Sequence, residues 1–172
     1  MNSLVKRNIY RTILVLAIQL VLLKRIDITF GGFNYIHFTI YPIIIALMPY
    51  KINKTLLVLI GFSLGLFVDL FYDSLGVHAA AACFTAYMRS YILQLLAPAE
   101  GYSKDGLTSY SYGFVWFVSY LGMLMFIHLF FLYSVEAFSF VYFKEIVLRT
   151  IFSFIASLFL LVLAQLIFNP KY

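Results

Sequence analysis

Three ionisable residues, Asp69, Arg89 and His128, lie inside long apolar stretches of the chain. Ionisable side chains in such stretches face the interior of a helix bundle, where they bind one another or backbone carbonyls. They could therefore form an ion pair or line a pocket for a polar ligand. No nucleophile with an orienting base and an oxyanion donor accompanies them, so the sequence predicts no catalytic site and a protein that is not an enzyme.

Each of the three residues has a preferred partner. Asp69 lies about one turn from the end of its apolar segment, where it either caps a turn or binds a buried group. His128 is the favoured partner of Asp69 because both are expected at similar depth, and the alternative is a core histidine bound to a backbone carbonyl. Arg89 should bind a carbonyl or a carboxylate. Asp69 is not favoured for it, because helical rise separates the two by roughly 12 Å.

Other polar residues are predicted to have structural roles. His78 and Asp73 belong to a turn and are too few to hold a metal ion. The lone Cys83 is expected to serve packing. Three glutamines inside apolar segments should form hydrogen bonds between helices: Gln19, Gln94 and Gln165. The chain has no glycine-rich phosphate loop, so we expect no cofactor.

Small residues surround Asp69 and define the elements that must position it. Gly61, Gly65 and Asp69 recur every four residues, which places them on one side of a helix. A Gly-xxx-Gly face lets a neighbouring backbone approach closely in lipid. The following segment carries a matching stripe after a turn at Gly76. We therefore expect a tight antiparallel hairpin whose packing or partner-binding surface consists of Gly61, Gly65, Asp69, Gly76, Ala79, Ala82 and Ala86.

The composition predicts an integral membrane protein. Of the 172 residues, 64% are hydrophobic, 20% aromatic and only 11% charged, which is far from the usual makeup of a soluble domain. The net charge of +5 comes from scattered lysines and arginines. These are too sparse to follow a phosphate backbone, so no nucleic-acid partner is expected.

Six membrane-spanning helices in one all-α domain, residues 1–172, are predicted, near 9–26, 35–48, 55–72, 77–97, 110–135 and 147–168. The uncharged part of the first span is short enough to compete with a signal-peptide core. The second contains Pro42 and is either a kinked span or a re-entrant segment, in which case five spans remain. Residues 26–34 are predicted to be a loop.

The distribution of lysine and arginine predicts that both termini are cytoplasmic. The cytoplasmic set would be Lys6, Arg7, Arg11, Lys51, Lys54, Lys104 and Lys171. The opposite set would be Lys24, Arg25, Lys144 and Arg149. Seven cations against four follow the positive-inside rule.

The hairpin motif resembles that of the MreD family of bacterial rod-shape proteins. Gly65-Leu66-Phe67-Val68-Asp69 matches the family's G-L-x-x-D core, and Leu75-Gly76-Val77-His78-Ala79 its L-G-x-H/N-A continuation. The resemblance implies a non-catalytic scaffold of the bacterial cytoplasmic membrane. Its partners would be MreC, the MreB filament, and the polymerase and penicillin-binding transpeptidase of lateral wall synthesis.

A second class of protein has the same size and hydropathy. MreD proteins resemble the six-helix substrate-binding subunits of energy-coupling-factor transporters, so the chain could instead carry a vitamin or another small molecule. Such a subunit would hold a pocket near the outer face. Asp69, His128 and Glu136 could bind a polar ligand there.

Overall fold

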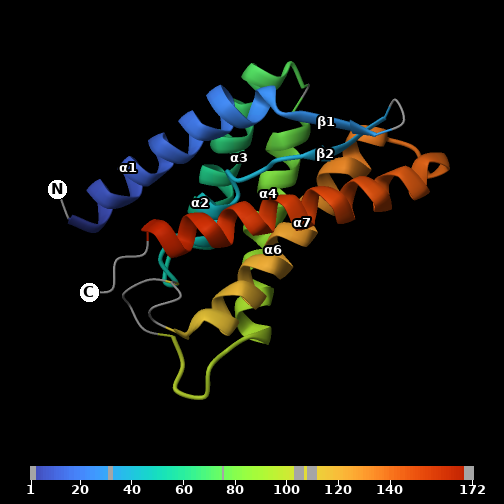
Figure 1. The fold of residues 1–172 in the computed structure, drawn as a ribbon. Helices are drawn as coiled ribbons and strands as arrows, with labels where there is room; N and C mark the ends of the chain where they lie inside the picture. Colours follow the sequence, from blue (N-terminus) through green and yellow to red (C-terminus); the bar gives the residue numbers. More distant parts are fainter. Residues whose placement is uncertain (1–2, 31–32, 75, 103–106, 108–111, 169–172) are drawn as a thin grey trace.

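The computed structural model describes residues 3–30, 33–74, 76–102, 107 and 112–168. The chain is mainly helical (Figure 1). Its elements are α1 Ser3–Ala17, the π-helical turn η1 Ile18–Leu22, the 3-10 turn η2 Leu23–Arg25, β1 Asp27–Phe30, β2 Phe33–His37, α2 Ile43–Ala46, α3 Lys54–Tyr72, α4 Val77–Leu95, α6 Phe114–Ala137, the 3-10 turn η3 Phe140–Tyr142 and α7 Phe143–Phe168.

Four of the long helices are neighbours in space in the order of the sequence. α3 packs along α4, α4 along α6 and α6 along α7, whereas α1 makes its main helix contact with the short α2 (Figure 1). We call the end of the bundle at the α3–α4 turn the turn end. The opposite end, where α4 ends and α6 begins, is the loop end.

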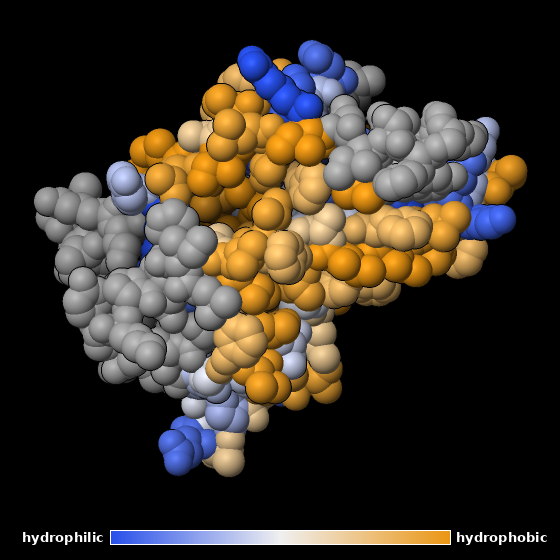
Figure 2. All heavy atoms as spheres, in the orientation of Figure 1, coloured by the Kyte–Doolittle hydropathy of each residue, from blue (hydrophilic) through white to orange (hydrophobic). Residues whose placement is uncertain are grey.

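Three helices in the described residues are long and apolar enough to cross a membrane: α3, α6 and residues Phe143–Gln165 of α7. A bilayer core of ~30 Å needs about 20 apolar residues. Large apolar side chains of these helices also point outward, for example Leu70 at 72% exposure and Phe159 at 63%. Apolar residues cover the middle of the face in Figure 2. Helix length, composition and surface together fit a membrane protein.

The predicted second span, 35–48, is not a helix of that length. Its first residues belong to β2, which pairs antiparallel with β1, so the loop predicted at 26–34 is largely a β-hairpin. The chain then continues to the single helical turn α2. Pro42 lacks a backbone N–H and can only begin such a turn. We call residues 38–49 the inner segment, because Tyr41, Ile45 and Ala46 within it are completely buried.

The inner segment runs back along the whole length of α3. The Gln19 side chain binds the Phe38 carbonyl and also the hydroxyl of Tyr72, the last residue of α3. Asn53, four residues after the segment, caps the first turn of α3. The 19 residues of α3 rise roughly 28 Å between these points. α1 and α3 therefore run in the same direction, and α1 begins near the end of α7 (Figure 1).

The other predicted spans correspond to helices with shifted bounds. Residues 9–26 fall on α1, η1 and η2, and 55–72 and 77–97 on α3 and α4. Span 110–135 corresponds to α6, with residues 110 and 111 outside the described chain, and span 147–168 to α7. The described residues thus contain five long helices rather than six. Lys104 and Lys171, used in the charge count, also lie outside the described residues.

Candidate functional site

The glycines of α3 lie directly against the backbone of α4. A Cβ added to Gly65 would lie 2.4 Å from the carbonyl oxygen of His78 and 2.5 Å from the Cα of Ala79. A Cβ added to Gly61 would lie 2.9 Å from the carbonyl oxygen of Ala82. Only glycine allows helices to approach this closely. The two predicted stripes therefore meet each other within the chain.

Ala86 and Gly76 have different places in this hairpin. Ala86 belongs to the contact, since its Cβ would be 3.2 Å from a Cβ at Gly61. Gly76 does not, because an added Cβ there would meet nothing within 4 Å. Gly76 has a φ of +83° and precedes α4, so glycine is needed here for its backbone conformation. Assigning Gly76 to the packing surface was wrong, because the turn needs its positive φ and not its small size.

Asp69 caps the first turn of α4 from the neighbouring helix. Its Oδ1 accepts hydrogen bonds from the backbone N–H of His78 at 3.0 Å and from the Ser74 hydroxyl at 2.5 Å. Its Oδ2 accepts from the backbone N–H of Ala79 at 2.9 Å. The first amides of a helix have no partner within that helix, and the helix dipole favours an anion beside them. Of the two predicted roles of Asp69, capping is the one found.

The same carboxylate fixes the ring of His78. His78 Nδ1 lies 3.0 Å from both Asp69 Oδ1 and Ser74 Oγ. The serine proton is directed at the carboxylate, so Nδ1 must be the donor to these acceptors. Asp, His and Ser therefore meet here, but the serine is not activated by the histidine. The arrangement is a helix cap rather than a nucleophilic triad.

The predicted pairing of Asp69 with His128 is wrong. His128 Nε2 lies 2.8 Å from the Tyr41 hydroxyl and Nδ1 lies 2.8 Å from the Thr85 hydroxyl. His78 takes the place beside Asp69 because it begins the helix that Asp69 caps. Similar depth along two helices could not reveal which of two histidines faces the carboxylate.

The protonation pattern of the buried His128 network follows from its donors. Thr85 donates its only hydroxyl proton to the Ala81 carbonyl at 2.7 Å, so it must accept from His128 Nδ1. His128 Nε2 then accepts from Tyr41. His128 is completely buried and acts as a neutral link between α4, α6 and the inner segment.

Arg89 binds the carbonyl end of the inner segment. Its Nη2 donates to the carbonyl oxygens of Met48 and, at 3.4 Å, of Pro49. Its Nε donates at 3.0 Å to the Tyr120 hydroxyl, which in turn donates at 2.9 Å to the Ala46 carbonyl. Arg89 is only 2% exposed. Of the predicted carbonyl and carboxylate partners, carbonyls are therefore the ones found among the described residues.

Polar side chains from other helices satisfy the rest of the inner segment. Gln19 Oε1 accepts from the backbone N–H of Ile40 at 2.7 Å. On α7, Ser157 accepts from the backbone N–H of Thr39 at 2.9 Å, and Ser153 accepts from that of His37, just before the segment, at 3.0 Å. Non-helical backbone is tolerated at membrane depth only where protein groups satisfy it. No buried side-chain nitrogen or oxygen of the described residues lacks a partner.

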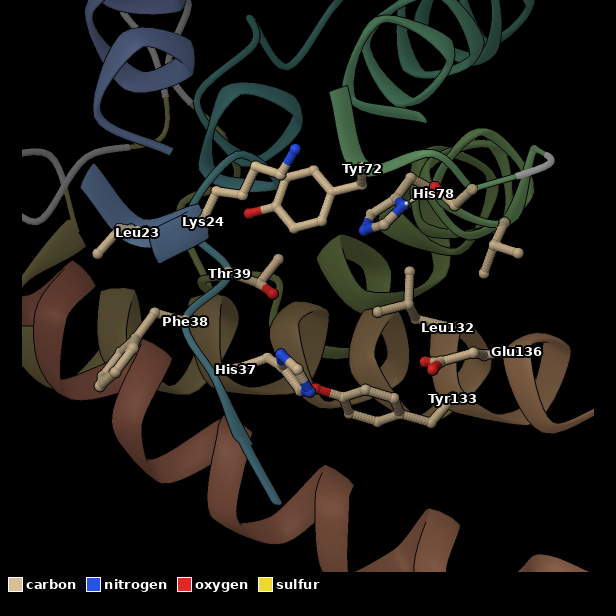
Figure 3. A pocket seen from close by; sticks show the side chains of 12 residues that line it. Leu23, Lys24, His37, Phe38, Thr39, Tyr72, His78, Leu132, Tyr133 and Glu136 are labelled. Carbon is tan, nitrogen blue, oxygen red and sulfur yellow. Dashed lines mark hydrogen bonds between the residues drawn. The ribbon is translucent and has the colours of Figure 1, made fainter. Parts of the chain in front are cut away.

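A cavity of about 190 Å³, lined by both polar and apolar side chains, opens at the turn end (Figure 3). Its lining comes from η2, β2, the inner segment, α3, α4 and α6, and includes Lys24, His37, Tyr72, His78 and Glu136. Neither Asp69 nor His128 lines it, whereas Glu136 does. Glu136 also forms an ion pair with Arg149 of α7 at 3.1 Å. Of the three residues predicted to bind a ligand, only Glu136 is thus in place to do so.

A cluster of aromatic rings closes the loop end. The Tyr102 ring lies 5.9 Å from Trp116 and 4.6 Å from Tyr50, and its hydroxyl donates to the Leu93 carbonyl at 2.6 Å. Burial first, and neighbouring tyrosines second, raise the pKa of Tyr102 to about 12. The Tyr102 hydroxyl therefore stays protonated at neutral pH.

Several residues of these networks were not singled out from the sequence. Ser153 and Ser157 lie four residues apart in the most apolar helix, a spacing that places both on one face and could have marked it as buried. Gln19 does join η1 to other elements. Gln94 is exposed and has no such role.

Comparison of the chain with protein families, with curated proteins and with solved structures finds no match. The predicted likeness to energy-coupling-factor subunits is accordingly not supported by any solved structure. Among the described residues, no group of three or more His, Cys, Asp or Glu side chains could hold a metal ion.

Proposed function

We propose that this chain is a non-catalytic scaffold of the bacterial cytoplasmic membrane, of the MreD type. It would act with MreC and, through the MreB filament, with the polymerase and penicillin-binding transpeptidase of wall synthesis. The motif at residues 65–79 and the helical, apolar architecture support this function.

One observation carries the proposal: the buried polar residues serve the fold itself. Asp69 caps α4, Arg89 holds the inner segment, and His128 links three elements. In a scaffold, polar residues should matter through packing and not through chemistry. A scaffold of this kind requires that its buried polar side chains bind other groups of the same protein, as these three do.

The membrane topology we propose has six crossings: α3, α6 and α7, which are long and apolar enough to span by themselves, together with α1, α4 and the inner segment. The inner segment would make the second crossing in the interior of the bundle, since it runs back along α3. Both termini would then be cytoplasmic, and the loop end would face the cytoplasm. The excess of lysine and arginine predicted on that side supports this orientation.

The partner surface cannot be the Gly61–Gly65 stripe, because α4 already covers it. A membrane partner must use outward-facing side chains. The outer face of α3 carries a continuous apolar set, Leu59, Phe62, Leu66, Phe67 and Leu70. We propose that a transmembrane helix of MreC packs there.

The test is co-purification of MreC with the full-length protein from membranes that contain both. Leu66→Trp on the outer face of α3 should reduce the recovered MreC several-fold. Ile155→Trp on the outer face of α7 is the matched control and should leave recovery unchanged. Equal recovery with both variants would refute the α3 surface. Normal cell shape after depletion of the protein would refute the scaffold.

The turn-end cavity favours a second candidate function, a carrier of a small molecule. The cavity lies at the turn end, which is the proposed outer side, and contains Glu136. A carrier predicts that Glu136→Gln abolishes ligand-dependent growth, because the ligand's polar group would lose its partner. The scaffold predicts normal rod shape with this variant. Complementation of a depletion strain, scored for shape and for growth on limiting vitamin, separates the two functions.

A further inference from the structure

An apolar groove of about 250 Å³ separates α1 from α7. Its walls come from Leu14 and Val15 of α1, Ile18 of η1, and Leu160, Leu161 and Ala164 of α7. Ile40, Ile43 and Leu47 form its floor. The groove lies on the face of Figure 2 where apolar residues surround a hollow between the two helices.

The polar residues of the groove are confined to one end. Arg11 and Gln165 line it at the loop end, while the lining toward Ile18 and Leu23 is apolar. A phospholipid has the same polarity, with an anionic phosphate at one end and acyl chains at the other. Arginine is well suited to phosphate because its guanidinium presents several donors in one plane.

We propose that the groove binds one anionic phospholipid, with an acyl chain between α1 and α7 and the phosphate at Arg11. The lipid lies against the floor that the inner segment forms and links α1, which has its main contact with α2, to α7. This inference depends on the proposed membrane location and not on the scaffold function.

The test is native mass spectrometry of the full-length protein, delipidated in detergent and then titrated with phosphatidylglycerol or phosphatidylcholine of identical chains. We expect preferential binding of one phosphatidylglycerol. Arg11→Gln should weaken that binding about fivefold, the equivalent of ~1 kcal/mol for one basic residue at a membrane surface. Lys54→Gln removes a cation at the same end but outside the groove, and should have no effect.

Filling the groove provides an independent readout. Ala164→Trp should abolish binding of both lipids, and Leu14→Trp serves the same purpose if the first variant does not fold. Glycerol phosphate should not compete, because the acyl chain is part of the site. Equal binding of both lipids by the unmodified protein, or unchanged binding after either tryptophan, would overturn the proposal. Neither result would alter recovery of MreC, so failure of the scaffold remains distinguishable.

Discussion

The α3–α4 hairpin and the inner segment are both deeply buried, but opposite means hold them in place. In the hairpin, Gly61 and Gly65 have no side chains, so the backbones of the two helices touch there. In the inner segment, polar side chains are added, because Arg89, Gln19 and Ser157 reach in to bind its backbone. The helices of the hairpin satisfy their own backbone hydrogen bonds, whereas the backbone of the inner segment needs partners from other elements.

The difference explains where the polar residues of this apolar chain lie. A helix satisfies its own N–H and C=O groups, so a helical hairpin needs an external partner only at its ends, where Asp69 caps α4. Extended backbone in an apolar interior needs a partner at every position. The buried Arg89, Gln19 and Ser157 therefore mark where non-helical backbone lies.

The hairpin should fail most severely when its glycines gain a side chain. Gly65→Ala places a methyl group 2.4 Å from a backbone carbonyl, and we expect a loss of about 3 kcal/mol of stability or more. Gly61→Ala, with a contact of 2.9 Å, should cost less. Thermal unfolding in detergent measures both. Gly122→Ala is the control, since its methyl would meet only side chains at 3.8 Å or more and should be neutral or slightly stabilising.

The inner segment should be most sensitive to loss of Arg89. Arg89→Met leaves the partly buried carbonyls of Met48 and Pro49 without this donor, and we expect a loss of about 2 to 3 kcal/mol. A cysteine at Met48 should become more reactive toward a thiol reagent in this variant. Unchanged stability would show that the arginine does not hold the segment. Gln94→Ala, at an exposed position of the same helix, should be silent.

Asp69→Asn tests whether charge matters at the junction of the hairpin. An asparagine keeps one acceptor but presents N–H donors to an amide that also donates, so we expect a loss of about 2 kcal/mol. Asp73→Asn is the matched control, because Asp73 has a φ of 54° and asparagine tolerates that conformation. Equal melting temperatures for the two variants would contradict the cap.

Ser157→Ala should have the smallest effect of the four. It removes one acceptor from the backbone N–H of Thr39, and we expect a loss of about 1 kcal/mol. Ser63→Ala should have almost none, because the Ser63 hydroxyl only binds a carbonyl of its own helix and is exposed. The difference between the two melting temperatures measures how much the hydrogen bond from the Thr39 N–H to Ser157 contributes to stability. A larger loss of stability at Ser63 than at Ser157 would contradict the conclusion that the inner segment depends on side-chain hydrogen bonds and the hairpin does not.

The sequence alone determined the features that are local or periodic. Apolar length predicted α3, α4, α6 and α7, and small residues at helical spacing predicted the contact in which Gly61 faces Ala82 and Ala86 and Gly65 faces Ala79. These follow from helical geometry, in which residues four apart share a face.

The tertiary structure decided everything that depends on how helices are rotated and which backbone they must satisfy. Asp69 is bound by His78 and not by His128, and Arg89 binds the carbonyls of Met48 and Pro49, which are 41 and 40 residues away in sequence. Apolar residues 35–48 became extended chain with one helical turn, because side chains from η1, α4, α6 and α7 supply hydrogen bonds that no short-range pattern encodes. Composition limits a segment to the interior, but only its neighbours determine whether it must be a helix there.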